Sequence, residues 1–376
     1  ATRESSEKAA SPASSPNSDQ NDDEVVPLDG TSFSMYYGQL LHQQNMLQDV
    51  VRTGTYQTAF AQNAKDFHGA TVLDVGTGSG VLAFFAIQSG AQKVYAVEMA
   101  SRMAEMARML VEGNNLSDSI EVIESSVEDL ALTEKVDILV SEPIGFLLVH
   151  ERMLESFITA RDRFLRPGGK IMPTRGTMIM APFSDESLWR EQQTKADFWA
   201  QPAFYGIDLS AVRERAQKEF FGQAVVGNFS SSSLLSADRA THVMDFETIS
   251  IDALQRFDVP LKFNINRTAI LHGIACWFDL DFLGSAAHVV LTTSPDSPTT
   301  HWYQCRLLFR EPIAVNAYQS VTGKLSFVSS SKVSYTIRMT LSLDGTPIAS
   351  SNTVHLQDQM YHYLGQSNDW AGYGVE

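Results

Sequence analysis

The sequence predicts an α/β domain built on a doubly wound parallel sheet, followed by an antiparallel β-barrel domain that carries a helical arm. Strand and helix patterns alternate up to about residue 173, as in parallel α/β folds. Short, alternating, β-branched segments follow them. The chain of 376 residues also exceeds the usual size of a single hydrophobic core, so two domains are expected.

The chain ends differ from these folded parts. Residues 1–30 are rich in Ser, Pro, Asp and Glu, and they hold too few apolar side chains to offset the entropy of ordering them. We expect a disordered tail there, and N-terminal helices with the α/β domain over residues 31–173. The barrel is expected over residues 174–357, with a polar and aromatic helical interval at 186–227, and a C-terminal tail over 358–376.

A glycine-rich loop follows the first predicted strand. Gly76, Gly78 and Gly80 allow the backbone to turn tightly and to approach a ligand at the start of the next helix. The spacing is G-x-G-x-G after Asp74, whereas a dinucleotide fingerprint would need glycine at Val81. A loop of this kind alone is weak evidence, because a structural βα turn has the same composition.

Glu98 strengthens the assignment of that loop to a cofactor site. It ends the second predicted strand, residues 93–97, where a carboxylate can accept hydrogen bonds from both hydroxyls of a ribose. Loop and carboxylate together are similar to the cofactor site of S-adenosylmethionine-dependent methyltransferases.

Two carboxylates flank a later loop. Glu142 directly follows the strand predicted at residues 138–140, and Glu151 comes after residues 143–150. Open α/β sheets bind ligands at the carboxyl ends of their strands, so both side chains can line one pocket. Neighbouring carboxylates repel each other unless a cation lies between them, and a guanidinium is planar, stays charged and makes bidentate contacts. The alternative is that Glu151 only begins an exposed helix.

Composition narrows the classes of partner. With 28 basic and 44 acidic residues, the net charge of −16 disfavours direct nucleic-acid binding and favours cationic partners.

Cys276 and Cys305 are the two cysteines, too few for a disulfide framework or a four-ligand zinc pattern, so no metal is predicted. There is no apolar run long enough to span a bilayer and no secretory signal, so we expect an intracellular protein without a membrane partner.

The order of these motifs resembles the protein arginine methyltransferases from about residue 34 to residue 343. Within that family the chain most resembles the coactivator-associated group, because Pro143 stands where many related enzymes have tryptophan. It rests on the glycine loop and on the segments YYG at 36–38, QNMLQD at 44–49, VRTGTY at 51–56, SEPIGFLLVHERM at 141–153 and THW at 300–302.

The resemblance implies a Rossmann-like S-adenosylmethionine-binding domain and assigns site residues. Arg52 would pair with the carboxylate of the cofactor, Glu98 would hold its ribose, and Glu128 its adenine. The full implied cofactor set is Tyr37, Gln43, Met46, Arg52, Asp74, Gly76, Gly78, Glu98, Val127, Glu128 and Ser156. The implied substrate-binding residues are Phe146, Met153 and Trp302.

The resemblance also implies a mechanism and a product. Glu142 and Glu151 would orient the substrate guanidinium for direct, in-line methyl transfer that leaves S-adenosylhomocysteine. His301 paired with Asp49 would accept the proton, although Glu151 is an alternative base. Met46 and Met153 beside the arginine pocket favour a type I enzyme, which makes monomethylarginine and then asymmetric dimethylarginine.

Further expectations concern partners and departures from the family pattern. The interval at 186–227 would be the arm of a homodimer, and the substrates would include histone tails and RNA-binding proteins in nucleus and cytoplasm. Ile144 and Phe146 replace the methionine and tyrosine of similar enzymes, so the preferred substrate stays open. Two alternative functions are a small-molecule methyltransferase, which the paired glutamates disfavour, and a catalytically silent dimeric binding module.

Overall fold

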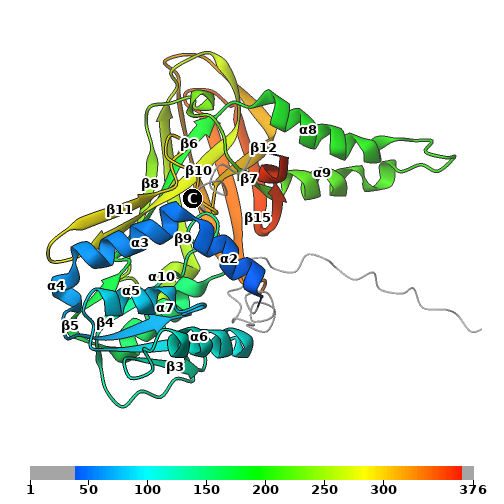
Figure 1. Ribbon diagram of the computed structural model, residues 1–376. Helices are drawn as coiled ribbons and strands as arrows, with labels where there is room; N and C mark the ends of the chain where they lie inside the picture. The colour runs from blue at the N-terminus through cyan, green and yellow to red at the C-terminus, as the bar shows by residue number, and fades with distance from the viewer. Residues whose placement is uncertain (1–38, 366–376) are drawn as a thin grey trace, which may run out of the picture.

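The computed structural model describes residues 39–365. In these residues an α/β domain lies beside a β-barrel from which a helical hairpin projects (Figure 1). Three expectations fall wholly or largely outside the described residues: the disordered tail at 1–30, the contact of Tyr37 with the cofactor, and most of the C-terminal tail.

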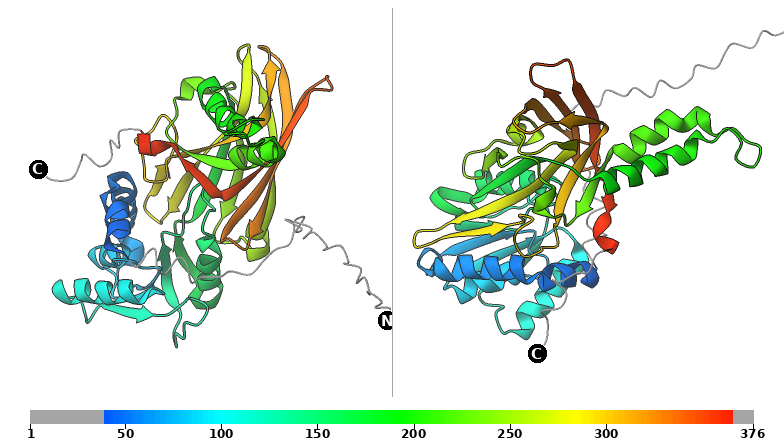
Figure 2. Two further views of the ribbon diagram at one scale, coloured as in Figure 1. Left: turned by 90° about the vertical axis from the view of Figure 1, so that its right-hand side faces the viewer. Right: turned by 90° about the horizontal axis from the view of Figure 1, so that it is seen from above.

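The N-terminal helices bridge the two domains. Helix α2 (Leu40–Gln48) is separated from α3 (Val50–Gln62) by Asp49, whose extended backbone ends one helix and whose side chain accepts the Arg52 amide at 2.9 Å to cap the next. Helix α3 then lies along the barrel hairpin (Figures 1 and 2), where the rings of Tyr56 and Phe282 meet at 4.8 Å. The short helix α4 (Ala64–Phe67) leads into the sheet.

The α/β domain contains five parallel strands in the order β3-β2-β1-β4-β5. The strand order reverses between β1 and β4, and such a switch point opens a crevice at the carboxyl ends of the strands. The expected doubly wound sheet is therefore confirmed. The strands are β1 (Thr71–Val75), β2 (Lys93–Glu98), β3 (Ile120–Glu124), β4 (Val136–Ser141) and β5 (Leu165–Met172), and the helices are α5 (Val81–Gln88), α6 (Ser101–Gly113) and α7 (Met153–Phe164).

The second domain is a nearly closed barrel. Its main path runs β8-β6-β10-β12-β7-β15-β14-β13-β9, and β11 pairs with β10. The end strands β8 and β9 approach each other where His242 stacks on Phe257 at 4.5 Å. The elements are β6 (Arg175–Phe183), β7 (Gln223–Gly227), β8 (Ala240–Asp245), α10 (Ile251–Gln255), β9 (Arg256–Asn264), β10 (Ala269–Leu283), β11 (His288–Thr292), β12 (Gln304–Val315), β13 (Ser320–Ser330), β14 (Ser334–Leu343) and β15 (Ala349–Tyr361).

The neighbouring strands of the barrel are antiparallel, as expected, except for one strand pair. Strands β15 and β7 are parallel, which requires a long crossover connection, and here the chain supplies it by forming β8 to β14 between them. Strand β15 also continues through Tyr361, past residue 358, where the tail was expected to begin. Pairing with β7 as far as Tyr361 explains this extension.

The helical hairpin is shorter than the interval predicted for the arm. It contains α8 (Glu186–Asp197), η1 (Phe198–Ala200), η2 (Ser210–Val212) and α9 (Arg213–Phe221), and it projects from the barrel in Figure 1 and in the right view of Figure 2. Residues 223–227, predicted to belong to the arm, instead form β7 between β12 and β15. This short, mostly apolar segment is almost wholly buried, as a strand inside a sheet must be.

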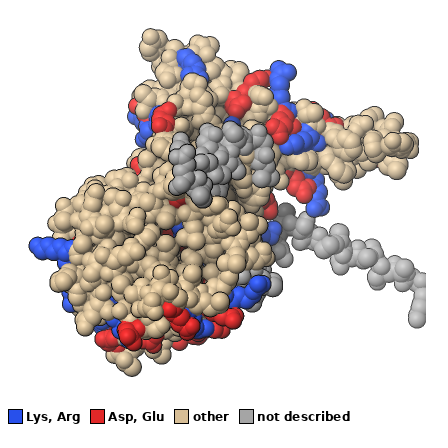
Figure 3. All heavy atoms as spheres, viewed as in Figure 1, with Lys and Arg blue, Asp and Glu red and all other residues tan. Residues whose placement is uncertain are grey.

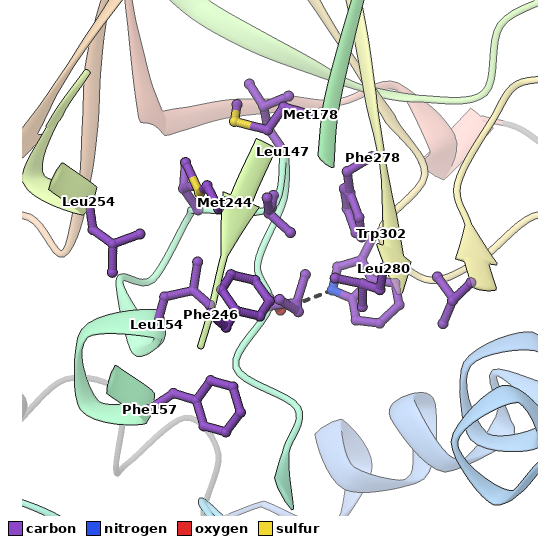
Figure 4. Packing of buried hydrophobic residues seen from close by; sticks show 14 of the residues in the cluster. Leu147, Leu154, Phe157, Met178, Met244, Phe246, Leu254, Phe278, Leu280 and Trp302 are labelled. Atoms are coloured by element: carbon purple, nitrogen blue, oxygen red, sulfur yellow. Dashed lines mark hydrogen bonds between the residues drawn. The ribbon is translucent and has the colours of Figure 1, made fainter. Parts of the chain in front are cut away.

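The loop between β4 and α7 lies in the core shared by the two domains. In Figure 4, Leu147 from this loop and Leu154 and Phe157 from α7 lie among barrel side chains that include Met178, Phe246 and Trp302. The Trp302 indole donates a hydrogen bond to the Ile144 carbonyl at 3.0 Å. The barrel therefore helps to fix the loop that begins with Glu142.

Two expected absences can be described only for residues 39–365. No helix in that range is both long and apolar enough to cross a membrane. The same range holds no cluster of three or more His, Cys, Asp or Glu side chains placed to bind a metal ion. Cys276 and Cys305 are both free thiols in the barrel core.

Candidate active site

One large cavity, of about 1020 Å³, opens at the carboxyl ends of β1, β2 and β4 and is bordered by α2 and by the barrel. It brings together most residues that the sequence assigned to cofactor and substrate. Those lining it are Gln43, Met46, Arg52, Gly76, Gly78, Glu98, Val127, Glu128, Glu142, Phe146, Glu151, Met153, Ser156, His301 and Trp302. Asp49 and Asp74 are fully buried and do not line it.

The glycine loop forms a closely covered floor of this cavity. Gly76 and Gly78 have φ angles of 66° and 55°, in the region that favours glycine. A Cβ atom at Gly78 would lie 2.7 Å from Oε1 of Gln43, and one at Gly76 would lie 2.2 Å from Cε of Met153. Helices α2 and α7 can approach the loop this closely because both positions lack a side chain.

Glu98 stands at the end of β2, as expected for a group that recognises a ribose. Its two oxygens accept the amides of Gly78 at 2.9 Å and Ala100 at 2.8 Å. Burial raises the pKa of Glu98, and these backbone hydrogen bonds only partly oppose the rise. A carboxylate has about four lone-pair sites, so both oxygens can still accept a ligand hydroxyl.

Asp74 supports the loop from beneath. Its Oδ2 accepts the Thr77 hydroxyl at 2.6 Å, whereas its Oδ1 is buried without a hydrogen-bond partner among the described residues. Burial raises the pKa of Asp74 to about 7, although the hydrogen bond from Thr77 opposes this shift. The structure therefore gives Asp74 a place behind the loop, away from the cavity.

On another side of the cavity, the segment that follows β3 contacts helix α7. The Ser156 hydroxyl donates to the Glu128 carboxylate at 2.8 Å, so these two residues of the implied cofactor set lie side by side. Arg163, which the sequence did not single out, donates to the carbonyls of Val127 at 2.7 Å and Glu128 at 2.6 Å. The Val127 carbonyl is thus already engaged by the protein.

Arg52 and Glu142 form a buried ion pair at the centre of the cavity wall. The Arg52 side chain is 8% exposed and the Glu142 side chain 9%, and their closest nitrogen and oxygen atoms are 2.7 Å apart. Burial acts to lower the pKa of Arg52, but the Glu142 charge outweighs it, and the net pKa is raised. Arg52 was expected to face a cofactor carboxylate, whereas its partner in the structure is the first glutamate.

The loop that carries the two glutamates has an unusual backbone. Leu147, Leu148, Glu151 and Arg152 all have positive φ, between 51° and 73°, which non-glycine residues adopt only when their surroundings enforce it. The buried Arg152 contributes to this enforcement, since it donates to the Glu155 carboxylate at 2.6 Å and to the Ser330 carbonyl at 3.0 Å. Glu142 and Glu151 consequently reach one cavity from opposite ends of the loop.

His301 and Asp49 lie together, as the family resemblance implied. Oδ2 of Asp49 lies 2.7 Å from Nδ1 of His301 and accepts the His301 amide at 2.7 Å. Burial acts to raise the pKa of Asp49, but the contacts with His301 and the backbone amides outweigh it, and the net pKa is lowered. Asp49 therefore orients the imidazole, whose Nε2 has no hydrogen-bond partner within residues 39–365.

The barrel adds aromatic residues that the sequence did not single out. Tyr303 and Tyr363 line the cavity and stack on each other at 4.2 Å. The position of Tyr303 next to Trp302 was the available signal. Tyr363 carried no such signal in the sequence, because the residues after 357 were assigned to a tail.

Comparison with known proteins agrees with this architecture. A family model described as a methyltransferase domain matches residues 72–169, and one described as the arginine methyltransferase oligomerization subdomain matches residues 174–346. Similar relatives include the histone-arginine methyltransferases CARMER of Drosophila willistoni and Drosophila persimilis, each 47% identical over 335 residues, or 89% of this chain. The chain spans about 62% of the length of these relatives.

Two solved structures of arginine methyltransferases match this chain over nearly their full length. Protein arginine methyltransferase 10 of Arabidopsis thaliana is 32% identical, with a TM-score of 0.79 over 86% of this chain and 99% of that one. A Trypanosoma brucei PRMT1 enzyme–prozyme complex with AdoHcy is 28% identical, with a TM-score of 0.76 over 85% of this chain and 99% of that one. Fold and cavity therefore define a methyltransferase-type domain joined to a barrel. The chain belongs to the protein arginine methyltransferase family, which confirms the resemblance found in the sequence.

Proposed function

We propose that this protein transfers methyl groups from S-adenosylmethionine to guanidino nitrogens of arginine residues in other proteins. The observation that carries the proposal is the arrangement of Glu142 and Glu151 in the cavity that the glycine loop and Glu98 also line. Two carboxylates lining one cavity suit a planar cationic group such as a guanidinium better than a neutral small molecule. Arg52 and His301 in the same cavity argue against a silent binding module.

The residues present fit the proposed cofactor. Glu98 suits a ribose, the facing pair of Glu128 and Ser156 suits an adenine, and Arg52 offers a cation at the edge between α3 and β4. Gln43 and Met46 would cover the bound molecule from α2. When bound, S-adenosylmethionine supplies an electrophilic methyl group on a sulfonium sulfur. No metal enters the proposal.

Glu142 and Glu151 would act by position and charge. They would hold the substrate guanidinium and draw its positive charge toward one nitrogen, which leaves the other more nucleophilic. Glu142 can serve the substrate while it is bonded to Arg52, because within the described residues Oε1 accepts only the Ile144 amide, at 3.1 Å, and retains a lone-pair site.

The substrate nitrogen must lose a proton after transfer. His301, oriented by Asp49 through Nδ1, presents Nε2 as the acceptor, since imidazole exchanges protons near neutral pH. Glu151 is the second candidate base, because it lines the same cavity.

We further propose a type I product, with monomethylarginine converted to asymmetric dimethylarginine. Met46 and Met153 line the cavity, and their bulk would hinder presentation of the opposite nitrogen after the first transfer. Histone tails are the first proposed substrates, supported by the names of the Drosophila relatives. RNA-binding proteins, and a nuclear and cytoplasmic location, follow from the family resemblance alone.

The proposed assembly is a homodimer in which the arm contacts the cofactor domain of a second copy. Phe198, Trp199, Tyr205 and Ile207 at the arm tip are 36–91% exposed, more apolar surface than an isolated hairpin tolerates well. The outer part of the arm also shows little charge in Figure 3. The matching oligomerization subdomain includes the arm, which supports this proposal.

The central experiment is incubation of the chain with isotope-labelled S-adenosylmethionine and arginine-rich histone-tail peptides, followed by mass spectrometry. Label on arginine is the expected result. Peptides with every arginine replaced by lysine are the matched control. Absence of label on arginine, or equal label on the lysine peptides, would overturn the proposed function.

A further inference from the structure

One side chain ties the end of the glutamate loop directly to the barrel. Nδ1 of His150 lies 2.8 Å from the Ser334 hydroxyl, which is 0% exposed at the start of β14. The two residues are 184 positions apart, so the contact exists only when both domains are folded and docked. His150 immediately precedes Glu151.

The His150 ring and backbone are fixed on other sides as well. The ring stacks on Phe146 at 6.0 Å with an interplanar angle of 21°, and the His150 amide donates to the Phe146 carbonyl at 3.1 Å. The His150 carbonyl packs so closely on Gly145 that a Cβ there would lie 2.2 Å from its oxygen. The loop is thus folded compactly on itself and attached to the barrel at this histidine.

Glu151 lies between two such attachments. Its own φ is 73° and that of Arg152 is 53°, so both residues depend on their neighbours to hold a disfavoured backbone. Arg152 is held on one side by Glu155 and Ser330. His150 is held on the other side by Ser334. Glu151 lines the cavity, whereas His150 does not.

We propose that His150 is a positioning residue for Glu151, and that its hydrogen bond to Ser334 makes the aim of the second glutamate depend on docking of the barrel. This inference rests on the proposed function, because it assigns the aim of Glu151 a role in methyl transfer. His150 acts only through its neighbour, since it lies outside the cavity.

The charge state of the ring suits this role. Burial lowers the pKa of His150 to about 4, so the imidazole is neutral at physiological pH. A neutral ring has one donor and one acceptor nitrogen, and a serine hydroxyl can match either. The link therefore persists in the pH range in which the enzyme would act.

The test uses the full chain with three single variants, the double variant His150→Phe/Ser334→Ala and one control. His150→Phe keeps an aromatic ring to stack on Phe146 but removes the nitrogen, and Ser334→Ala removes the hydroxyl. His150→Asn places an amide near the position of Nδ1 and can restore the bond. Ser342→Ala, at an exposed serine on the same strand, is the matched control. The measurements are kcat and KM for a histone-tail peptide, the Kd for S-adenosylhomocysteine by calorimetry, and Tm.

We expect His150→Phe and Ser334→Ala each to lower kcat by about 10- to 100-fold, as small misplacements of a reacting group do. The double variant should lose little more than the worse single variant, because both remove one bond. His150→Asn should recover most of the activity. The Kd for S-adenosylhomocysteine should stay within about 2-fold of the wild-type value, because the cofactor contacts are elsewhere.

Three results would overturn the inference while leaving the proposed function intact. They are wild-type kcat in both single variants, fully additive losses in the double variant, and a loss of kcat matched by equal losses of cofactor binding and Tm. A wild-type chain with no arginine methylation would overturn the proposed function itself, and this inference with it.

Discussion

The guanidinium of Arg52 donates two hydrogen bonds to Oε2 of Glu142, from Nη2 at 2.7 Å and from Nε at 3.0 Å, across 90 positions of the chain. The pair joins the residue proposed for the cofactor carboxylate to a residue proposed for the substrate. Each of the two proposed binding functions therefore depends on the same ion pair. Because Glu142 belongs to this ion pair, substitutions of Glu142 and Glu151 should differ in their effects on stability.

Glu142→Gln and Glu151→Gln should each lower methyl transfer by about 10²- to 10⁴-fold, because both remove charge that acts on the substrate guanidinium. Glu142→Gln should also destabilise the fold by about 1–3 kcal/mol, because it leaves the buried Arg52 charge without its partner. Peptide methylation assays and urea unfolding measure the two effects. Near-normal turnover in both variants would refute the assignment of the glutamates.

Gly78→Ala should greatly weaken binding of S-adenosylhomocysteine. The new Cβ would meet Oε1 of Gln43 at 2.7 Å on a backbone with φ of 55°, so the loop or helix α2 must shift. Gly54→Ala is the control, since a Cβ there meets nothing within 4 Å and alanine favours the surrounding helix α3. Calorimetry should find unchanged binding for Gly54→Ala. Equal affinities for the two variants would contradict the proposed place of the loop in the site.

The ionisation of Asp74 should make stability fall with rising pH. Its pKa is raised from 3.8 in the unfolded chain to about 7 in the fold, so the folded state binds the proton more tightly. The stabilisation that the fold gains from this bound proton is fully present below about pH 4, and it is lost as the pH rises through about 7. Between pH 4 and 8, the free energy of unfolding should fall more steeply for the wild type than for Asp74→Asn.

Asp118→Asn, which makes the same substitution at an exposed aspartate, is the matched control for this pH series. Parallel pH profiles for wild type and Asp74→Asn in urea unfolding would mean that Asp74 does not retain its proton in the fold.

Removal of the arm tip aromatics should dissociate the proposed dimer. Trp199→Ala combined with Tyr205→Ala leaves the helices of the hairpin in place and removes two exposed rings from its tip. Light scattering should then report a monomer, with reduced methylation activity. Tyr318→Ala is a suitable control, because Tyr318 is 96% exposed in the turn between β12 and β13 and does not belong to the arm. A dimer that survives the double substitution would exclude this interface.

The dimethylated product should be asymmetric. The bulk of Met46 and Met153 in the cavity should direct the second methyl group to the nitrogen that carries the first. Fragmentation spectra of methylated peptides distinguish the two isomers by their neutral losses. A mainly symmetric product would refute the type I assignment.

Local sequence patterns were sufficient to predict the strands and the glycine-rich loop of the α/β domain. Apolar runs set β1 and β2, glycine at positions 76 and 78 marked the turn between β1 and α5, and Glu98 was placed correctly at the end of a strand. These features depend on periodicity and backbone freedom over a few residues, which the sequence displays directly. The arm was located in the same way, but its C-terminal limit was not.

Tertiary structure decided which partner each polar or aromatic group meets. It placed residues 223–227 in the barrel, Glu142 on Arg52, Ser334 on His150, and Tyr363 in the cavity wall. Each of these outcomes joins segments far apart in the chain, and a hydrogen bond forms only when its atoms approach to about 3 Å. Sequence spacing does not specify such approaches, because they follow from how the barrel packs against the parallel sheet and the loop between β4 and α7.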